Sequence, residues 1–287
     1  ELTQGEKHPM RSQAIVPLVT YPDPNSETVA ANAAAMAAWL QADLHALALN
    51  VDIPPVSNAL SQVLMDVPQL ARQAESASQK QGDRLLAAVA QQGVKADVDV
   101  TVSTLAIAPA LLSDAAASHG RYFDFVLVGW ERNNPTCRTT AEAVVFGSGR
   151  PTVLLPEQSV IAAVNHVAIA WDGSRVAARA VGDSRRLLEY AKKISVITIV
   201  DEKPLIADNA GERLVERLRN SGLEADARAV RAEGRAIGAT LQEQAIELGA
   251  DLLVMGGYGH SRVRDFVLGG ATRGILSDLR LPVLISH

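Results

Sequence analysis

Cysteine is nearly absent from this sequence, since Cys137 is the single one among 287 residues. One cysteine excludes an intramolecular disulfide and a cysteine-based metal cluster, and it fits a reducing cytoplasm. Basic charge is not in excess either: 27 lysines and arginines face 32 aspartates and glutamates, for a net charge of −5. This balance argues against a dedicated DNA- or RNA-binding protein, which needs a basic surface to meet phosphate.

Long hydrophobic runs are missing too. No stretch approaches the roughly 18 apolar residues of a membrane helix, and no apolar secretion signal stands near the start. We therefore expect a cytoplasmic protein without a membrane partner. Either Met10 is the native start, or residues 1–9 are a disordered native leader. Apolar residues nevertheless make up 48% of the chain, which is enough for two domain cores.

The chain repeats one plan twice. "GVKAD" (93–97) resembles "GLEAD" (222–226), "FVLVGW" (125–130) resembles "LLVMGG" (252–257), and "RPTVLLP" (150–156) resembles "LPVLISH" (281–287). The first copy is about 22 residues longer, and the excess lies between residues 50 and 92. We expect one domain at residues 10–157 and a second at 164–287, with a short connector that lets them pack together.

Short apolar runs alternate with helical patterns in both copies. The expected strands are residues 14–19, 44–49, 97–103, 125–129 and 152–155, then 166–171, 194–200, 225–230, 251–257 and 282–286. The helices expected in the second copy are residues 177–190, 210–220, 235–248 and 270–279. This alternation predicts an α/β fold of two tandem, doubly wound, five-stranded parallel-sheet domains with the strand order 3-2-1-4-5.

The ends of the two copies are expected to meet. Each copy closes on a short apolar strand at the edge of its sheet, and such an edge invites pairing. We therefore expect an intramolecular pseudo-dimer. In the first helix of the chain, residues 26–42, Ser26 is the expected N-cap, and Met36 and Trp39 are expected in the core.

Two strand ends in the second copy carry the candidate site. In a sheet of this order, ligands bind beyond the carboxyl ends of strands one and four. Ala170, Trp171 and Asp172 close strand one, and a glycine-rich segment follows strand four. The glycines allow close backbone approach to an anion, and the last of them opens a helix, whose start attracts phosphate. Because the carboxylate of Asp172 suits a ribose hydroxyl or a base edge, the combination points to a nucleotide. The segment matches neither GxGxxG nor GxxxxGK[ST].

"AWDGS" and "VMGGYGHSRVRDFVLGGATRGILSDLRLPVLIS" resemble the universal stress protein (UspA) family. The nucleotide-binding members of that family carry G-x2-G-x9-G-[ST]. Gly256, Gly259 and Gly269 fit this spacing, but Gly270 stands where the family has serine or threonine. The resemblance covers both copies as a tandem and is degenerate in the first.

The resemblance implies ATP as the ligand, and we expect Mg²⁺ with it because the ion neutralises phosphate charge. Asp172 would contact the adenosine part, and the backbone of Ile199 would meet the adenine. The remaining implied contacts surround the phosphates: Gly256, Gly259, Gly269, Gly270, Ala271 and Thr272, the last as a substitute for the missing hydroxyl. In the first copy, Trp130 and Glu131 stand where glycines are needed, so we expect no ATP there and a role as the pairing partner.

Three functions remain open. The first is a nucleotide-responsive stress factor without dedicated catalysis, which is the function that the resemblance implies. The second is an interaction module that has lost nucleotide binding and holds a protein partner or an apolar ligand between its halves. The third, an α/β hydrolase or nucleotidyl transferase, lacks a visible acid–base set. The sequence names no protein partner, and association of tandem chains into a homo-oligomer is a further possibility.

Other polar residues have ordinary explanations. Ser174 is expected to cap a helix, Cys137 to be an ordinary loop cysteine, and Asp201 with Glu202 to lie in a solvated loop. The six histidines form no metal-binding spacing. Three basic residues could either meet phosphate or face solvent: His260, Arg262 and Arg273.

Overall fold

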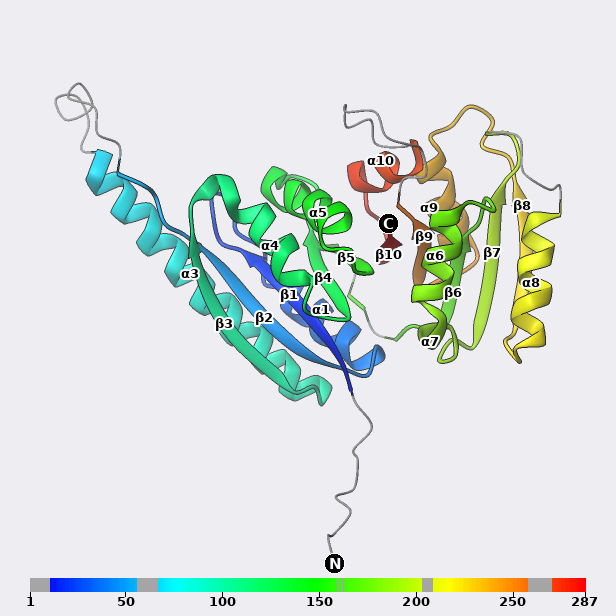
Figure 1. The fold of residues 1–287 in the computed structure, drawn as a ribbon, viewed down its shortest axis with the longest axis horizontal. Coiled ribbons are helices and arrows are strands. Elements are labelled where there is room, and N and C mark those ends of the chain that lie inside the picture. The colour runs from blue at the N-terminus through cyan, green and yellow to red at the C-terminus, as the bar shows by residue number, and fades with distance from the viewer. Residues whose placement is uncertain (1–10, 56–66, 159, 162, 203–208, 258–269) are drawn as a thin grey trace, which may run out of the picture.

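The computed structural model describes residues 11–55, 67–158, 160–161, 163–202, 209–257 and 270–287. Their strands form one ten-stranded sheet in the order β3-β2-β1-β4-β5-β10-β9-β6-β7-β8 (Figure 1). Each half therefore has the predicted strand order 3-2-1-4-5. The strands are β1 (Ser12–Val19), β2 (Ala42–Val51), β3 (Val100–Ile107), β4 (Phe125–Trp130), β5 (Thr152–Pro156), β6 (His166–Ala170), β7 (Lys193–Ile199), β8 (Ala225–Val230), β9 (Leu252–Gly256) and β10 (Val283–Ser286).

The two halves join edge to edge through their last strands. β5 and β10 run antiparallel, with Leu154 opposite Val283 and Thr152 opposite Ile285. The neighbouring strands inside each half run parallel. The prediction that the two apolar edges meet within one chain is thus confirmed, and each half provides the strand that covers the other's edge.

Helices cover both faces of this sheet, and each face has a hydrophobic core that runs through both halves (Figure 1). One face carries α1 (Thr28–Trp39), α3 (Val67–Ala96), α6 (Arg175–Asp183), α7 (Arg185–Leu188) and α8 (Ala210–Asn220). The opposite face carries α4 (Leu112–Gly120), preceded by the short 3-10 helix η1 (Pro109–Leu111), and α5 (Pro135–Gly147), α9 (Ile237–Glu247) and α10 (Gly270–Ser277). Met36 is buried and Trp39 packs against the core, as predicted.

The extra length of the first half appears largely as a longer helix, since α3 has 30 residues and α8 has 11. Both helices end in the same turn. Asp97 has φ +55° and Val98 N–H donates to Gly93 C=O at 2.9 Å, while Gly222 has φ +83° and Leu223 N–H donates to Leu218 C=O at 3.1 Å. This is the Schellman ending of a helix.

The shared turn makes Asp97 the structural counterpart of Gly222. The predicted match of "GVKAD" with "GLEAD" is therefore wrong by one helical turn. The strand predicted from residue 97 is also misplaced: Asp97 ends the preceding helix, and β3 begins three residues later, at Val100.

Two further details of the predicted helices are wrong. The helix predicted over 177–190 breaks at Ser184, whose hydroxyl donates to Ala180 C=O at 2.7 Å and so competes with the helix ladder. Ser26 does not cap α1, because its buried Oγ has no partner among the described residues. Its backbone N–H donates to the Glu131 carboxylate at 2.8 Å instead.

Candidate functional site

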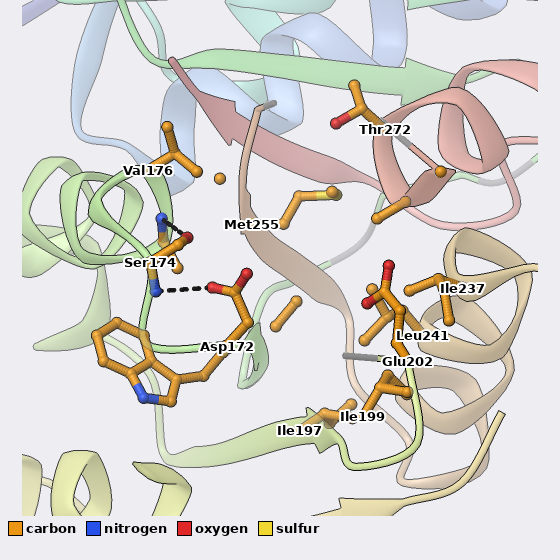
Figure 2. Close-up of a pocket in the computed structure, with 16 residues that line it drawn as sticks. Asp172, Ser174, Val176, Ile197, Ile199, Glu202, Ile237, Leu241, Met255 and Thr272 are labelled. Atoms are coloured by element: carbon orange, nitrogen blue, oxygen red, sulfur yellow. Dashed lines mark hydrogen bonds between the residues drawn. The ribbon is translucent and has the colours of Figure 1, made fainter. Parts of the chain in front are cut away.

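A pocket lies beyond the carboxyl ends of β6 and β9, where α6, α9 and α10 approach (Figure 2). Its walls include most of the residues predicted for the site: Ala170, Trp171, Asp172, Ile199, Gly256, Gly270, Ala271 and Thr272. The other two predicted residues, Gly259 and Gly269, lie outside the described part of the chain, as do His260 and Arg262. Residues distant in sequence thus meet in one cavity at the predicted edge of the sheet.

Asp172 is held in place by the turn that follows β6. Its Oδ1 accepts a hydrogen bond from Ser174 N–H at 2.9 Å, and Gly173 between them has φ +74°. Ser174 in turn caps α6 by accepting from Ala177 N–H at 3.2 Å, as predicted. Figure 2 shows the Asp172 carboxylate directed toward the pocket interior. The same turn therefore starts the helix and fixes the direction of the acid.

Close packing of α6 against β9 requires glycine at position 256, which the sequence did not reveal. A Cβ on this residue would lie 2.5 Å from the carbonyl carbon of Val176 and 2.6 Å from the backbone nitrogen of Ala177. Only glycine lets the first turn of α6 lie so close to β9. Gly129, the corresponding residue of β4, would place its Cβ 2.8 Å from the side chain of Val29 in α1. Helix packing explains a glycine here in both halves, whether or not a ligand approaches.

The acidic pair after β7, Asp201 and Glu202, lies in an exposed bend, as predicted, and Asp201 is anchored there. The Asp201 carboxylate accepts hydrogen bonds from the N–H groups of Ala232 at 2.7 Å and Glu233 at 2.9 Å. These two bonds hold the pKa of Asp201 below its ordinary value. They tie the end of β7 to the segment after β8, and the adjacent Glu202 lines the pocket.

The inner wall of the pocket is apolar, and of its residues only Ile199 was predicted, through its backbone. Its side chains come from β7, α9 and β9 and are Ile197, Ile199, Ile237, Leu241 and Met255 (Figure 2). The indole of Trp171 is fixed at the rim because its Nε1 donates to Ala210 C=O at 3.0 Å. Continuous apolar runs indicated that these strands were buried, but not that several of their side chains face a cavity.

The charge of the pocket is negative on its described walls. Asp172 and Glu202 are the ionisable side chains among the described lining residues. The start of α10 offers the opposite polarity, because the first N–H groups of a helix have no partner within it. A Cβ on Gly270 would have no heavy atom within 4 Å, so there is open space beside this helix start. The pocket thus combines an apolar wall, two acids and a helix N-terminus.

The corresponding crevice of the first half is filled by its own side chains. Asn25 precedes α1 by the same three residues as Asp172 precedes α6, and it is 2% exposed. Its amide nitrogen donates to the Cys137 sulfur at 3.0 Å and to Glu131 Oε1 at 3.3 Å. Glu131 also accepts from Asn134 Nδ2 at 3.2 Å. This network occupies the position that corresponds to the Asp172 turn, and the absence of ATP binding from the first half stays a prediction.

Cys137 lies within α5 and is fully buried, so the expectation of a loop cysteine is wrong. Burial, and after it the charge of Glu131, raises the pKa of its thiol well above the ordinary value. Because the thiolate is the reactive form, we expect the folded protein not to react with dithionitrobenzoate at pH 8. Unfolding in guanidinium should release one reactive thiol per chain. Rapid reaction of the folded protein would contradict this placement.

The described residues offer neither a metal-binding cluster nor a membrane helix. No group of three or more histidine, cysteine, aspartate or glutamate side chains in the described ranges could hold a metal ion. None of the helices in that part of the chain combines the length and the hydropathy that a membrane span needs. Arg273 lies on the exposed face of α10 and does not line the pocket.

Comparison with known proteins identifies a family. Residues 164–287 match the profile of the Universal stress protein family. Universal stress protein Slr1230 of Synechocystis sp. is 28% identical over 148 residues, which are 50% of this chain and 49% of that protein. The chain thus matches about half the length of this relative.

Two solved structures share the fold over nearly the whole chain. A universal stress protein from Archaeoglobus fulgidus DSM 4304 has a TM-score of 0.70 and 16% identity, covering 96% of this chain and 99% of its own. A functionally unknown protein from Pseudomonas aeruginosa PAO1 has a TM-score of 0.57 and 15% identity, covering 96% and 92%. At these identities the likeness is one of fold, and it includes both halves.

Proposed function

We propose that this chain, which belongs to the universal stress protein family through residues 164–287, binds an adenine nucleotide in the pocket of its second half. The observation that carries the proposal is the meeting of Asp172 and the start of α10 in one cavity with an apolar wall. The chain would act in the cytoplasm as a nucleotide-responsive stress factor, with ATP as its ligand.

The apolar wall and the acids suit the nucleoside end of the ligand. A flat base can pack against the isoleucine, leucine and methionine side chains of the wall, and Ile199 at the end of β7 offers backbone groups to its edge. A carboxylate accepts hydrogen bonds from ribose hydroxyls or an exocyclic amine. The Asp172 carboxylate would repel a neighbouring phosphate, so we expect the nucleoside end of the ligand to lie next to Asp172.

The start of α10 suits the phosphate end. The dipole at the start of a helix attracts anions, and the open space at Gly270 can receive one without a lysine. The described residues contain no carboxylate cage for a cation. Mg²⁺ would therefore enter with ATP, held by phosphate oxygens and water, and neutralise charge near the two acids of the pocket.

The alternative is an interaction module that holds a partner or an apolar ligand between the halves. The junction of the halves favours the nucleotide instead, because its described side chains pack against one another: Trp130 is 3% exposed, and Val283 and Leu284 of β10 are fully buried. The two carboxylates of the described lining, Asp172 and Glu202, are assigned here to the nucleoside end of the ligand, away from the phosphates. We therefore infer binding without dedicated catalysis.

Calorimetric titration of the full chain with ATP and Mg²⁺ tests the proposal. We expect a micromolar dissociation constant and a change in the emission of Trp171, since this residue is among those that line the pocket. No heat at millimolar ATP would support the interaction module. Rapid turnover of ATP would instead show an enzyme and contradict binding without catalysis.

Gly270→Ser should strengthen ATP binding, because it adds a hydroxyl where the helix start faces open space. The backbone of Gly270 does not require glycine, since its φ lies outside the left-handed region and an added Cβ meets nothing within 4 Å. One added neutral hydrogen bond contributes about 0.5–1.5 kcal/mol, or roughly 2- to 10-fold in affinity. The matched control is Gly270→Ala, which fills the same space without a hydroxyl. Equal affinities of the two variants would contradict a hydroxyl–phosphate contact.

A further inference from the structure

α10 connects the pocket to the first half of the chain. Its first residues, Gly270, Ala271 and Thr272, line the pocket. Near its other end, the carbonyl oxygen of Leu276 accepts a hydrogen bond from the indole Nε1 of Trp130, in β4, at 3.3 Å. Six residues of α-helix separate Gly270 from Leu276, a length of about 9 Å. One short helix therefore touches both the ligand cavity and the other half.

The residue after α10 is held from both halves. The Asp278 carboxylate pairs with Arg132 of the first half and with Arg280, whose Nε lies 2.9 Å from Oδ2. Its carbonyl oxygen accepts from the buried Gln242 Nε2 at 2.7 Å, and Gln242 Oε1 accepts from Arg280 N–H at 2.8 Å. Burial opposes ionisation of Asp278, but the hydrogen bond from Arg280 and the charge of Arg132 outweigh it and lower its pKa. Side chains of both halves thus hold the end of α10 in position.

A second contact with the first half lies directly after β9, next to the pocket residue Gly256. Gly257, directly after β9, donates its N–H to Ser286 C=O at 2.7 Å, and its own carbonyl oxygen lies 3.0 Å from His287 Nδ1. The imidazole of His287 meets the ring of Phe146, in α5, edge to face with centroids 5.2 Å apart. The first half therefore contacts His287, which meets the chain directly after β9, as well as the end of α10.

α10 also packs too closely against α9, on the same face of the sheet, to shift freely. Where it crosses α9, a Cβ on Gly238 would lie 2.5 Å from Ala271 C=O, so the two helix backbones are in direct contact. A displacement at one end of such a helix moves the other end, because packed elements transmit strain. The position of the Leu276–Asp278 end is then linked to the position of the pocket end.

From these contacts we infer that Trp130 and Arg132 of the first half are positioning residues for the ligand pocket of the second half, acting through α10. The inference rests on the proposed nucleotide binding. It gives the first half a role in that binding without a site of its own: Trp130 at the end of β4 and Arg132 shortly after it hold the helix at whose start the phosphates would lie. Linkage is reciprocal, so ligand binding must also strengthen the contact between α10 and the first half.

Affinity for two probes, ATP and adenosine, tests the inference in the full chain. Arg132→Ala should weaken ATP binding about two- to fivefold, the range expected for a partly exposed ion pair, and leave adenosine binding and the melting temperature unchanged. Trp130→Phe, which keeps an aromatic side chain and removes the N–H donor, should act in the same direction. The matched control is Arg11→Ala, which removes the exposed ion pairs of Arg11 with Asp43 and Asp99, both at 3.2 Å. It should leave both affinities unchanged.

Hydrogen exchange of the unmodified protein provides a second measurement. ATP should slow the exchange of backbone amides in residues 131–134, which lie in the first half, more than adenosine does. ATP binding with unchanged exchange there, together with unaltered ATP affinity of Arg132→Ala and Trp130→Phe, would overturn the inference and leave the proposed function standing. Absence of ATP binding to the unmodified protein would overturn both.

Discussion

Gly238→Val is expected to destabilise the protein and to weaken ligand binding at the same time. A Cβ at this position would lie 2.5 Å from the Ala271 carbonyl oxygen and 2.7 Å from the Ile275 backbone nitrogen, and backbone atoms cannot move aside as a side-chain tip can. Overpacking of this kind costs about 1–3 kcal/mol, and valine adds two methyl groups beyond Cβ. Because the displaced helix lines the pocket, we also expect ATP affinity to fall. Guanidinium denaturation and calorimetry measure the two effects.

The control for this variant is a helical glycine that has free space beside it. A Cβ on Gly182, in α6, would have no heavy atom within 4 Å, and the φ of this residue is outside the left-handed region. Gly182→Ala should therefore stabilise the protein by about 0.4–1 kcal/mol, by restricting the unfolded chain. If Gly238→Val were as stable as the unmodified protein, α9 and α10 could not cross with their backbones in contact.

Asp172→Ala is expected to reduce ATP affinity at least about 10-fold, since a hydrogen bond to a charged group contributes about 1.5–3 kcal/mol. The variant also loses the acceptor for Ser174 N–H, which shapes the turn before α6. Asp172→Asn keeps an acceptor and removes only the charge, so its ATP affinity should lie between those of the unmodified protein and Asp172→Ala. Titration with both ATP and adenosine shows which end of the ligand the carboxylate meets.

The sign of the Asn effect decides the orientation of the nucleotide. If the carboxylate binds the ribose or base, both ATP and adenosine should bind more weakly to Asp172→Asn. If it faces phosphate instead, removing the charge would strengthen ATP binding, and the proposed orientation would be wrong. Asp183→Asn is the matched control, because Asp183 lies at the far end of α6 and pairs with Arg179 on the surface at 3.3 Å. It should change neither affinity.

The architecture was predictable because it depends on patterns that span many residues. Apolar runs buried on both faces, separated by helical segments, indicated parallel strands in a doubly wound fold, and the expected order 3-2-1-4-5 is the one observed in each half. Two short apolar end strands indicated edges that need covering, and β5 and β10 cover each other. The edge of the sheet at which Asp172 and Gly256 meet followed from the strand order alone.

The details that failed depend on single side chains and their tertiary partners. Ser26 has the residue type of a cap, but Glu131, 105 residues away, takes its N–H and leaves the hydroxyl without that role. Cys137 stands in a polar sequence, yet Asn25 and Glu131 fold over it and bury it. No local pattern contains a contact made across the sheet, so the sequence could not predict these outcomes.

The boundary errors have a different cause. Asp97 adopts a left-handed backbone conformation that glycine usually provides, so its role as a helix ending was not visible in its residue type. The exposed loop of Asp201 was predicted, but its hydrogen bonds from the N–H groups of Ala232 and Glu233 were not, because they come from a segment 31 residues further along the chain.

The antiparallel pairing of β5 with β10 has a consequence for how the two halves can evolve. Two identical chains that associate through a twofold axis must present one surface that fits itself, so every substitution is felt twice. A covalent tandem is free of that condition. One half can acquire a tryptophan that donates a hydrogen bond to a helix carbonyl of the other half, as Trp130 does to Leu276 here. No second, symmetry-related copy of that contact is required. The union also survives dilution, because the partners never separate.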